Sequence, residues 1–293
     1  MRVSVLIASY NTRDLLLEAI ASVASEPDVN NEVIVVDNAS ADHSAEAVAE
    51  HFPEVRLVRQ PINLGFAAAI NRAARLAAGE HLLLLNPDAS LCPGALASLV
   101  GVLERQPRAA AVGPSLIYPD GRPQAAAFRF PSLAQLVLDL FPIDRLADSR
   151  LNGRLSTTSE PMPIDHPLGA CVLIRRAAWE DVGLLDEGYF MYVEEVDWCR
   201  RAHLRGWQIW HDPRARAVHH GGSATRQRAD AMFVELWRSR LRYYQRFHSY
   251  GFNRLVVHGL VRLGIRAEAR RSRAAPNPVG RRQSVGRVRQ LVG

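Results

Sequence analysis

The feature that most constrains the fold is the alternation of short apolar runs with amphipathic segments through the first 105 residues. Four runs are rich in branched aliphatic residues, as is typical of strands buried on both faces of a sheet: Val3–Ala8, Val33–Val36, Val55–Val58 and His81–Leu85. Segments with helical periodicity follow them, at about residues 12–23, 41–51, 65–78 and 93–105. Because parallel strands need crossover connections, this order predicts an α/β fold with a mostly parallel sheet flanked by helices on both faces.

The second half of the chain is less regular. Residues 114–165 are rich in Pro, Gly, Ser and Thr, which predicts an irregular insertion. Strands are then expected at Cys171–Ile174 and Trp207–Trp210, and helices at Glu195–Arg205 and Arg228–Phe247. We therefore predict a single domain over residues 1–250, with halves 1–113 and 166–250 on either side of the insertion.

The basic charge of the chain is concentrated at its C-terminus. The net charge is +6 and there is no lysine. Residues 266–293 contain eight arginines and one glutamate, so they carry +7 and the preceding residues carry −1. The Arg, Pro and Gly content predicts a disordered tail, and the near-neutral body disfavours a nucleic-acid-binding protein. Residues 251–265 mix apolar side chains with arginines and predict either an interfacial helix at an anionic membrane or a solvated segment without a partner.

The cysteines and the N-terminus indicate the compartment. There are three cysteines and no CxxC spacing, so neither a disulfide framework nor a zinc cluster is expected. The apolar run at the N-terminus is too short for a signal-peptide core or a membrane span. We therefore expect a cytoplasmic protein, with peripheral contact at the inner face of the membrane as a hypothesis.

Polar residues follow the predicted strands at the edge where open α/β sheets bind ligands: Ala8–Asn11, Asp37–Ser40, Gln60–Asn63 and Asn86–Asp88. Any one of these groups can simply cap the next helix, but four in succession favour a site for a polar ligand. The chain has no GxGxxG after the first strand and no lysine for a P-loop. A carboxylate such as Asp37 can accept the N3–H of a pyrimidine, and Asp88 can hold a divalent cation.

Four segments of the first half resemble the donor half of glycosyltransferase family 2. In chain order they are VSVLIASYN, VIVVDNAS, NLGFAAAINRA and LLLLNPDA. A segment of the second half is similar to the acceptor half of the family: GACVLIRRAAWEDVGLLDEGYFMYVEEVDWCRRAHLRGWQI. The segment ARAVHHGGSA is similar to the family's closing histidine motif. More narrowly, the chain resembles the bacterial rhamnosyltransferase-like members. This resemblance covers about residues 3–248. It implies a GT-A fold and an inverting transferase, with dTDP-rhamnose as the first donor expected.

The resemblance also implies the partners and the donor site. The donor would be a dTDP- or UDP-linked sugar, and the acceptor a lipid-linked or cell-surface glycan. The donor-binding residues implied by the matched motifs are Ala8, Tyr10, Asn11, Asp37, Asn38, Ser40, Asn63, Gly65, Phe66, Asn71 and Asp88. At Gly65, the absence of a side chain is expected to allow close approach of a ligand to the backbone.

The metal site and the catalytic base are implied in the same way. Asn86-Pro87-Asp88 matches the Asp-x-Asp metal motif of the family with its first Asp replaced, so Asp88 is an expected ligand of Mg²⁺ or Mn²⁺. His219 matches the histidine of the closing motif and is the second expected ligand. The family's Glu-Asp pair corresponds to Glu194-Glu195. We therefore expect Glu195 to be the general base, with Glu194 and Asp197 as alternatives. Carboxylates at a helix start are also favourable for reasons of the helix dipole alone.

Two other functions remain open. A catalytically silent nucleotide-sugar-binding or scaffold protein would bind donor without turnover, and the two motif replacements keep this alternative open. A nucleic-acid-binding protein dependent on the arginine tail would show steeply salt-dependent binding that is lost with the tail.

Overall fold

The computed structural model describes residues 2–26, 29–141, 150–156, 158–223, 227–248, 256–257, 259–264, 266 and 287–288. Tertiary contacts divide the chain into two compact units. The first comprises Met1–Arg129, Leu155–Phe190 and Glu194–Ala224, and the second comprises Phe130–Arg154, Met191–Val193 and Thr225–Gly293.

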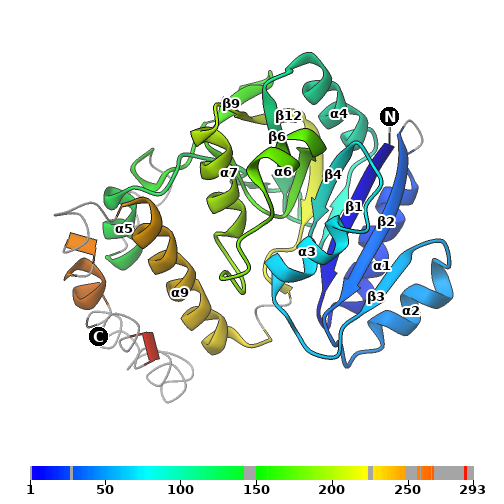
Figure 1. The fold of residues 1–293 in the computed structure, drawn as a ribbon, viewed down its shortest axis with the longest axis horizontal. Coiled ribbons are helices and arrows are strands. Elements are labelled where there is room, and N and C mark those ends of the chain that lie inside the picture. The colour runs from blue at the N-terminus through cyan, green and yellow to red at the C-terminus, as the bar shows by residue number, and fades with distance from the viewer. Residues whose placement is uncertain are drawn as a thin grey trace. The chain divides into compact units, whose positions relative to one another are not determined.

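The first unit is built on a ten-stranded sheet in the order β3-β2-β1-β4-β11-β6-β12-β5, with β7 beside β6 and β9 beside β12 (Figure 1). Its parallel part consists of β1 (Arg2–Ser9), β2 (Asn30–Asp37), β3 (Arg56–Arg59) and β4 (His81–Leu85). The predicted α/β fold and its four leading strands are thereby confirmed. Because β1, β2 and β4 are parallel neighbours, their carboxyl ends lie at one edge of the sheet.

The rest of the sheet is mixed. β11 (Cys171–Arg175) runs antiparallel to both β4 and β6 (Ala109–Ile117). β12 (Gln208–His219) runs parallel to β6, and its end pairs antiparallel with β5 (Ala89–Leu91). The strand predicted at Trp207–Trp210 therefore continues much further, through a register shift between Asp212 and Arg216. That irregularity breaks the alternation from which the length of a strand is predicted.

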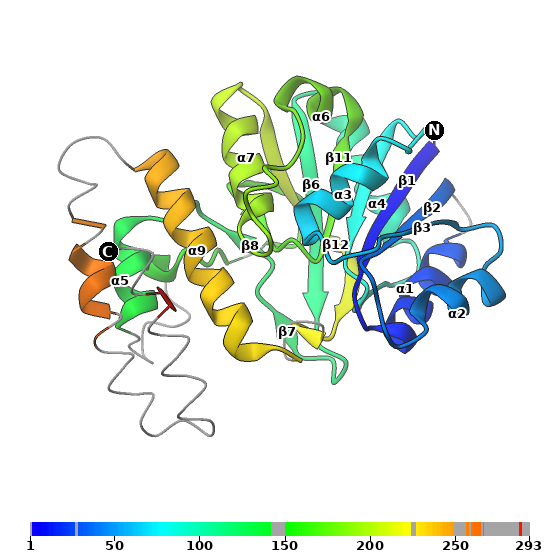
Figure 2. The ribbon, with the colours of Figure 1, turned by 60° about the horizontal axis from the view of Figure 1, so that its bottom comes forward.

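Helices cover both faces of the sheet. They are α1 (Arg13–Ala24), α2 (Ser44–His51), α3 (Phe66–Ala74), α4 (Ala95–Arg105), α6 (Arg176–Val182) and α7 (Glu194–Leu204). α1 buries Leu16, Ala19, Ile20 and Val23, the apolar stripe expected of a helix packed on a sheet. Figure 2 shows α3 on the opposite side of the sheet from α1.

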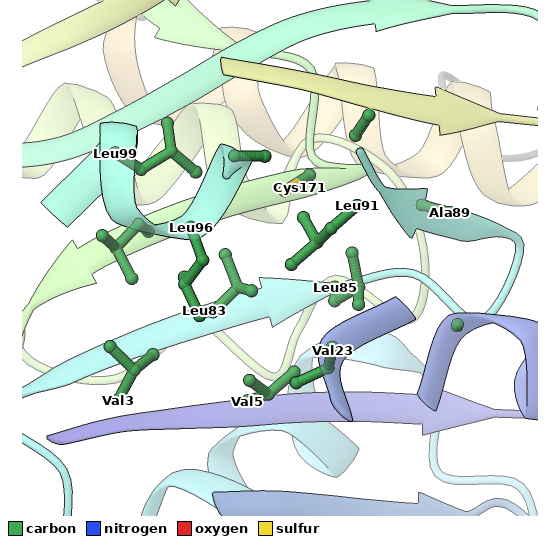
Figure 3. Packing of buried hydrophobic residues seen from close by; sticks show 14 of the residues in the cluster. Val3, Val5, Val23, Leu83, Leu85, Ala89, Leu91, Leu96, Leu99 and Cys171 are labelled. Atoms are coloured by element: carbon green, nitrogen blue, oxygen red, sulfur yellow. The ribbon is translucent and has the colours of Figure 1, made fainter. Parts of the chain in front are cut away.

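The core between the sheet and α1 and α4 is formed by alternate residues of the strands. Val3 and Val5 of β1 point to the same face because successive side chains of a strand alternate. Figure 3 shows these valines with Leu83 and Leu85 of β4, near Leu96 of α4.

Cys171 lies in this core, and burial raises the pKa of its thiol to about 12. It is therefore a small apolar core residue rather than a reactive thiol. Cys92, Cys171 and Cys199 are free cysteines in the structure.

Residues 114–165 contain more regular structure than predicted. β6 extends to Ile117, and the segment also forms β7 (Pro123–Gln124), β8 (Ala127–Phe128), α5 (Leu133–Leu140), a 3₁₀ turn at Arg150–Asn152 and β9 (Met162–Ile164). The new strands are two or three residues long and are defined by their partners, as in the pairing of Gln124 with Leu116. Strands this short have no periodicity to detect.

The second unit has its own apolar cluster. α5 contributes Leu136 and Leu140, and α9 (Ala229–Phe247) contributes a stripe of Val234, Trp237, Leu241 and Tyr244. The helix predicted at residues 228–247 is thereby confirmed. Val257 and Val261, from the segment predicted as an interfacial helix, are buried in this same cluster. Nearly all of the predicted tail lies outside the described residues.

Within the part of the chain that the structure describes, no helix combines the length and the apolar character needed to cross a membrane.

Candidate active site

The carboxyl ends of β1 and β2 are joined by hydrogen bonds between the residues predicted to bind the donor. The backbone N–H of Asn11 donates to Ser40 Oγ at 3.0 Å, and Asn11 Oδ1 accepts from the N–H of Ala41 at 2.7 Å. Asn11 has a left-handed backbone (φ 51°), which asparagine tolerates better than most residues. The turns after the two strands are thus fixed against each other. Ala8, at the end of β1, is buried, and Tyr10 is half-buried beside it.

Asp37 ends β2 with one oxygen committed and one unpaired. Its Oδ2 accepts the N–H of Ser40 at 3.1 Å, while the buried Oδ1 has no hydrogen-bond partner among the described residues. A buried carboxylate oxygen without a donor is costly, so this atom is a candidate acceptor for a donor group on a ligand.

Asn38 connects this edge to the start of α3. Its Nδ2 donates to the carbonyl of Gly65 at 3.3 Å, and the Gly65 N–H donates to Asn63 Oδ1 at 2.9 Å. Phe66, which follows, donates its N–H to the Phe190 carbonyl at 2.8 Å.

The structure gives a local reason for glycine at position 65. Its φ is +84°, and a Cβ there would lie 2.4 Å from the carbonyl oxygen of Phe190. The missing side chain therefore allows another segment of the chain to approach closely, and the expected approach of a ligand stays a prediction.

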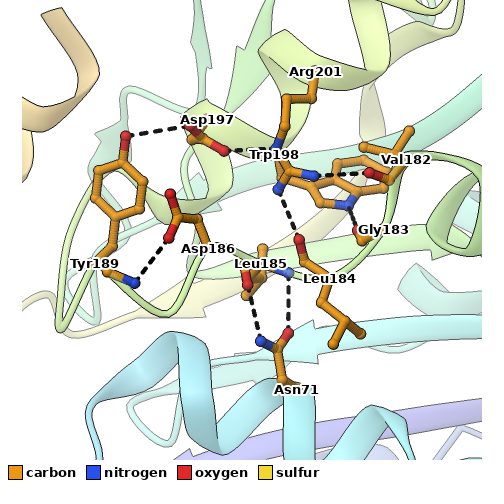
Figure 4. Close-up of polar contacts among 11 residues, drawn as sticks. Asn71, Val182, Gly183, Leu184, Leu185, Asp186, Tyr189, Asp197, Trp198 and Arg201 are labelled. Atoms are coloured by element: carbon orange, nitrogen blue, oxygen red, sulfur yellow. Dashed lines mark hydrogen bonds and ion pairs between the residues drawn. The ribbon is translucent and has the colours of Figure 1, made fainter. Parts of the chain in front are cut away.

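Asn71, predicted among the donor residues, is fully buried in α3 and bonds to the segment that follows α6. Its Nδ2 donates to the Leu185 carbonyl at 2.9 Å and its Oδ1 accepts the Leu185 N–H at 3.0 Å (Figure 4). The same Nδ2 also lies 2.9 Å from Glu187 Oε1. The side-chain amide of Asn71 thus bonds to both the N–H and the carbonyl of Leu185, as a neighbouring strand would. These bonds hold residues 183–189 against α3.

Asp197 holds the same segment from the other side (Figure 4). This fully buried carboxylate accepts from Arg201 Nε at 2.7 Å and from the Tyr189 hydroxyl at 3.3 Å. The Arg201 guanidinium also donates to the carbonyls of Val182 and Leu184. Both oxygens of Asp197 are therefore engaged by protein groups.

Asp88 and His219 are brought together because the end of β12 pairs with β5, placing His219 opposite Ala89. Asp88 Oδ1 lies 3.4 Å from His219 Nε2, and Asp88 Oδ2 accepts the Ser223 N–H at 3.0 Å. Burial by itself raises the pKa of Asp88, but the contacts with His219 and Ser223 together outweigh it, so the pKa is lowered. Asp88 is therefore a carboxylate at neutral pH.

The chemistry of this pair suits a divalent cation. His219 Nδ1 lies 2.9 Å from Gln124 Oε1, which can only accept, so Nε2 is the ring nitrogen that faces Asp88. A carboxylate oxygen and an imidazole nitrogen that face each other can share a proton, and both are ligand types that a divalent cation accepts in its place. The described residues contain no group of three or more His, Cys, Asp or Glu side chains around a metal position. The remaining ligands of a cation would be oxygen atoms of other kinds, such as those of a bound diphosphate or water.

Glu194 and Glu195 begin α7 and differ in their surroundings. Glu194 is buried, and its Oε2 has no partner among the described residues. Burial, followed by the negative charge of Glu195, raises the pKa of Glu194 well above its usual range. Burial also raises the pKa of Glu195, but backbone N–H groups, including that of Gly169 at 3.2 Å, oppose the shift. Glu195 is only half-buried, so it is the more accessible of the two.

Gly169 and Ala170 link this carboxylate to the metal motif. The Gly169 N–H donates to Glu195 Oε1, and the neighbouring Ala170 carbonyl accepts the Asn86 N–H at 2.8 Å. Asn86 is the first residue of the Asn86-Pro87-Asp88 motif. Two candidate sites far apart in sequence therefore meet at one short segment before β11.

Some residues at this site could not be predicted from the motifs. Gln124 lies in the segment predicted to be irregular, and its contact with His219 spans 95 residues. Gly169 precedes a buried strand, and the sequence offered no sign of its contact with Glu195. No sequence pattern marked Gln124 as a site residue. Gly169 is the first residue of the GACVLIRR segment, which resembles the family, so that segment could have indicated it.

Comparison with known proteins agrees with this architecture. The model of the family described as "Glycosyl transferase family 2" matches residues 4–183. The chain is 35% identical over 220 residues to the N-acetylglucosaminyl-diphospho-decaprenol L-rhamnosyltransferase of Mycobacterium tuberculosis, covering 70% of each protein.

Solved glycosyltransferase structures share the fold. The mannosyltransferase PcManGT from Pyrobaculum calidifontis aligns with a TM-score of 0.59 and 20% identity, covering 99% of this chain and 80% of that one. S. aureus TarS aligns with a TM-score of 0.54 and 16% identity, covering 100% and 90%. The fold is thus that of a GT-A glycosyltransferase. The chain belongs to glycosyltransferase family 2, and its likeness is to the rhamnosyltransferases of that family.

Proposed function

We propose that this enzyme transfers rhamnose from dTDP-rhamnose, with inversion, to a hydroxyl of a lipid-linked glycan. The observation that carries this proposal is the segment Gly169-Ala170, which bonds to the metal motif through Asn86 and to the candidate base Glu195. The mycobacterial relative supports the sugar and the acceptor, because its name specifies rhamnosyl transfer to a sugar-diphospho-decaprenol.

The donor nucleotide is assigned to the edge formed by β1, β2 and α3. The unpaired Oδ1 of Asp37 would accept the N3–H of thymine or uracil in dTDP or UDP. Ala8, Tyr10, Asn11 and Ser40 would line the rest of the base and ribose site. Asn38, Asn63, Gly65 and Phe66 would lie beside the diphosphate. For Asn71 we propose a positioning role, because its amide already bonds to Leu185.

Asp88 and His219 are the residues that would hold Mg²⁺ or Mn²⁺. A bound cation of this kind neutralises the charge that develops on a departing diphosphate. PcManGT, which shares the fold, was solved with GDP-mannose and Mn²⁺. Gln124 would orient the imidazole by accepting its Nδ1–H.

Glu195 is the proposed base. The acceptor oxygen would form a bond to the anomeric carbon as the bond from that carbon to the diphosphate breaks, and Glu195 would take the hydroxyl proton. Attack on the side opposite the leaving group inverts the anomeric configuration. Glu194, whose pKa is raised well above its usual range, would hold its proton more firmly than an ordinary glutamate, and Asp197 would hold the protein segment around Tyr189.

Metal-dependent nucleotide binding tests the donor assignment. We expect dTDP or UDP with Mn²⁺ to raise the melting temperature of the wild-type protein by several degrees, since a ligand at a hundred times its Kd stabilises by about 2.7 kcal/mol. Asp88→Ala should abolish the metal-dependent part of the shift, whereas the exposed α2 variant Glu50→Ala should retain it. A wild-type protein whose melting temperature responds to no nucleotide with metal would contradict the proposal.

Peripheral attachment to anionic membranes is a further part of this proposal, and it rests on the arginines. Val257 and Val261 are buried, so they are not apolar anchors. We expect the variant with Arg270, Arg271, Arg273, Arg281 and Arg282 changed to Gln to lose sedimentation with anionic vesicles, at about 1 kcal/mol per arginine near the surface. These positions lie outside the described residues. Equal sedimentation of the variant and the wild type would exclude this mode of attachment, and neutral vesicles serve as the control.

A further inference from the structure

Gly169 lies between β10 (His166–Pro167) and β11, and it is closely apposed to a single side chain. Its N–H donates to Glu195 Oε1 at 3.2 Å. A Cβ at this position would lie 2.9 Å from Glu195 Cδ, 3.0 Å from Oε1 and 3.1 Å from Cγ. All three of its nearest neighbours would therefore belong to Glu195.

The backbone conformation does not explain why this residue is glycine. Gly169 is not among the glycines with positive φ, so other residues can adopt its conformation. Gly65 differs, because its φ is +84° and a Cβ there would strike the Phe190 backbone. At Gly169 the space is taken by the carboxylate end of Glu195.

The contact fixes one oxygen of Glu195. Oε1 is held by a backbone N–H, which cannot rotate away as a side-chain donor can. The Ala170 carbonyl beside it accepts the Asn86 N–H, so the same segment is also fixed to the metal motif. The position of the Glu195 carboxylate is thereby tied to the position of the metal motif.

We propose that Gly169 is a positioning residue for the catalytic base: its N–H fixes Oε1 of Glu195, and its missing side chain leaves room for the carboxylate, so that Oε2 faces the acceptor hydroxyl. This inference rests on the proposed function, in which Glu195 takes the proton of the acceptor. To that proposal it adds the backbone N–H of Gly169 as the group that sets the position of the Glu195 carboxylate.

The first test is Gly169→Ala. The added methyl meets the end of a flexible side chain, so Glu195 rotates away while the fold is retained. A displacement of about 1 Å at a reacting group can cost about 10²-fold in rate. We expect kcat to fall about 10- to 100-fold, with the KM for donor, the shift in melting temperature with dTDP and Mn²⁺, and the far-UV circular dichroism unchanged.

Gly101→Ala is the matched control. Its Cβ would also meet the end of a flexible side chain, Arg105 Nη1 at 3.0 Å, but on α4. We expect wild-type kcat for this variant.

A double-mutant comparison separates positioning from a general structural effect. In a Glu195→Gln background there is no base to misplace, so adding Gly169→Ala should lower the residual rate by less than twofold. If the two losses multiply instead, Gly169 acts independently of Glu195 and the inference is wrong. If Glu195→Gln alone keeps wild-type kcat, the proposed base itself is wrong.

A measurement on the wild-type protein covers the case in which Gly169→Ala does not fold. The amide proton shift of Gly169 in NMR spectra should titrate with the midpoint seen in the pH profile of kcat, and this titration should vanish in Glu195→Gln. A Gly169 amide that does not respond to pH would overturn the inference.

Discussion

Replacing Glu195 with Gln is expected to lower kcat by about 10²- to 10⁴-fold, the range that general base catalysis contributes. Gln has nearly the same size and can still accept the Gly169 N–H, but it cannot take a proton. Donor binding should be unaffected, because the donor is assigned to other residues. Steady-state kinetics with dTDP-rhamnose and a lipid-linked acceptor would measure the loss, and a thermal shift with dTDP and Mn²⁺ would verify binding.

Glu194→Gln is the matched control for this experiment. Because the pKa of Glu194 is raised well above its usual range, this group keeps its proton to a higher pH than an ordinary glutamate, and an amide resembles the protonated acid. We therefore expect a much smaller loss of kcat. The opposite ranking, with Glu194→Gln inactive and Glu195→Gln active, would assign the base to Glu194.

The sign of the pH dependence follows from the same assignment. Burial raises the pKa of Glu195, so the fraction of enzyme with an ionised base falls at a higher pH than for an exposed glutamate. The rate of the wild-type enzyme should therefore decrease as the pH falls through this raised pKa, and the limb should disappear in Glu195→Gln.

The parallel half of the fold could be predicted because its signals are local. β1 and β4 are short, mostly apolar runs, and α1 has a stripe at helical spacing, so period and length alone identify them. β7 and β8 have two residues each and exist only through their partners in space. No local pattern could have identified them, and the same holds for the passage of β12 beyond Asp212.

The candidate site divides in the same way. Asp37, Asp88 and Glu195 were predicted because strand ends and family motifs mark them in the sequence. Their immediate partners, Gln124 and Gly169, depend on contacts between distant segments that spacing does not encode. For Asn71, the family motif predicted a donor-binding residue. In the structure, both the oxygen and the nitrogen of its side-chain amide bond to the backbone of Leu185.

Asp197→Ala is expected to destabilise the protein by about 3 to 5 kcal/mol, as is typical when one partner of a buried ion pair is removed. The Arg201 guanidinium, bonded to Asp197 at 2.7 Å and largely buried, would lose its counter-charge, and the Tyr189 hydroxyl would lose its acceptor. The segment around Leu184, which Arg201 also holds, would loosen. The midpoint of urea unfolding would measure the loss.

The outcome for Asp197 also distinguishes a structural role from a chemical one. Asp197→Asn retains the shape and one acceptor oxygen, so it should recover part of the stability and, at a temperature where it is folded, most of the wild-type kcat. Combining Asp197→Ala with Arg201→Met removes both charges together and should cost less than the sum of the two single changes. A fully stable Asp197→Ala protein without turnover would instead make Asp197 a participant in proton transfer. That result would return the choice of base to all three carboxylates at the start of α7, because Glu195 would then be only one of two groups required for the reaction.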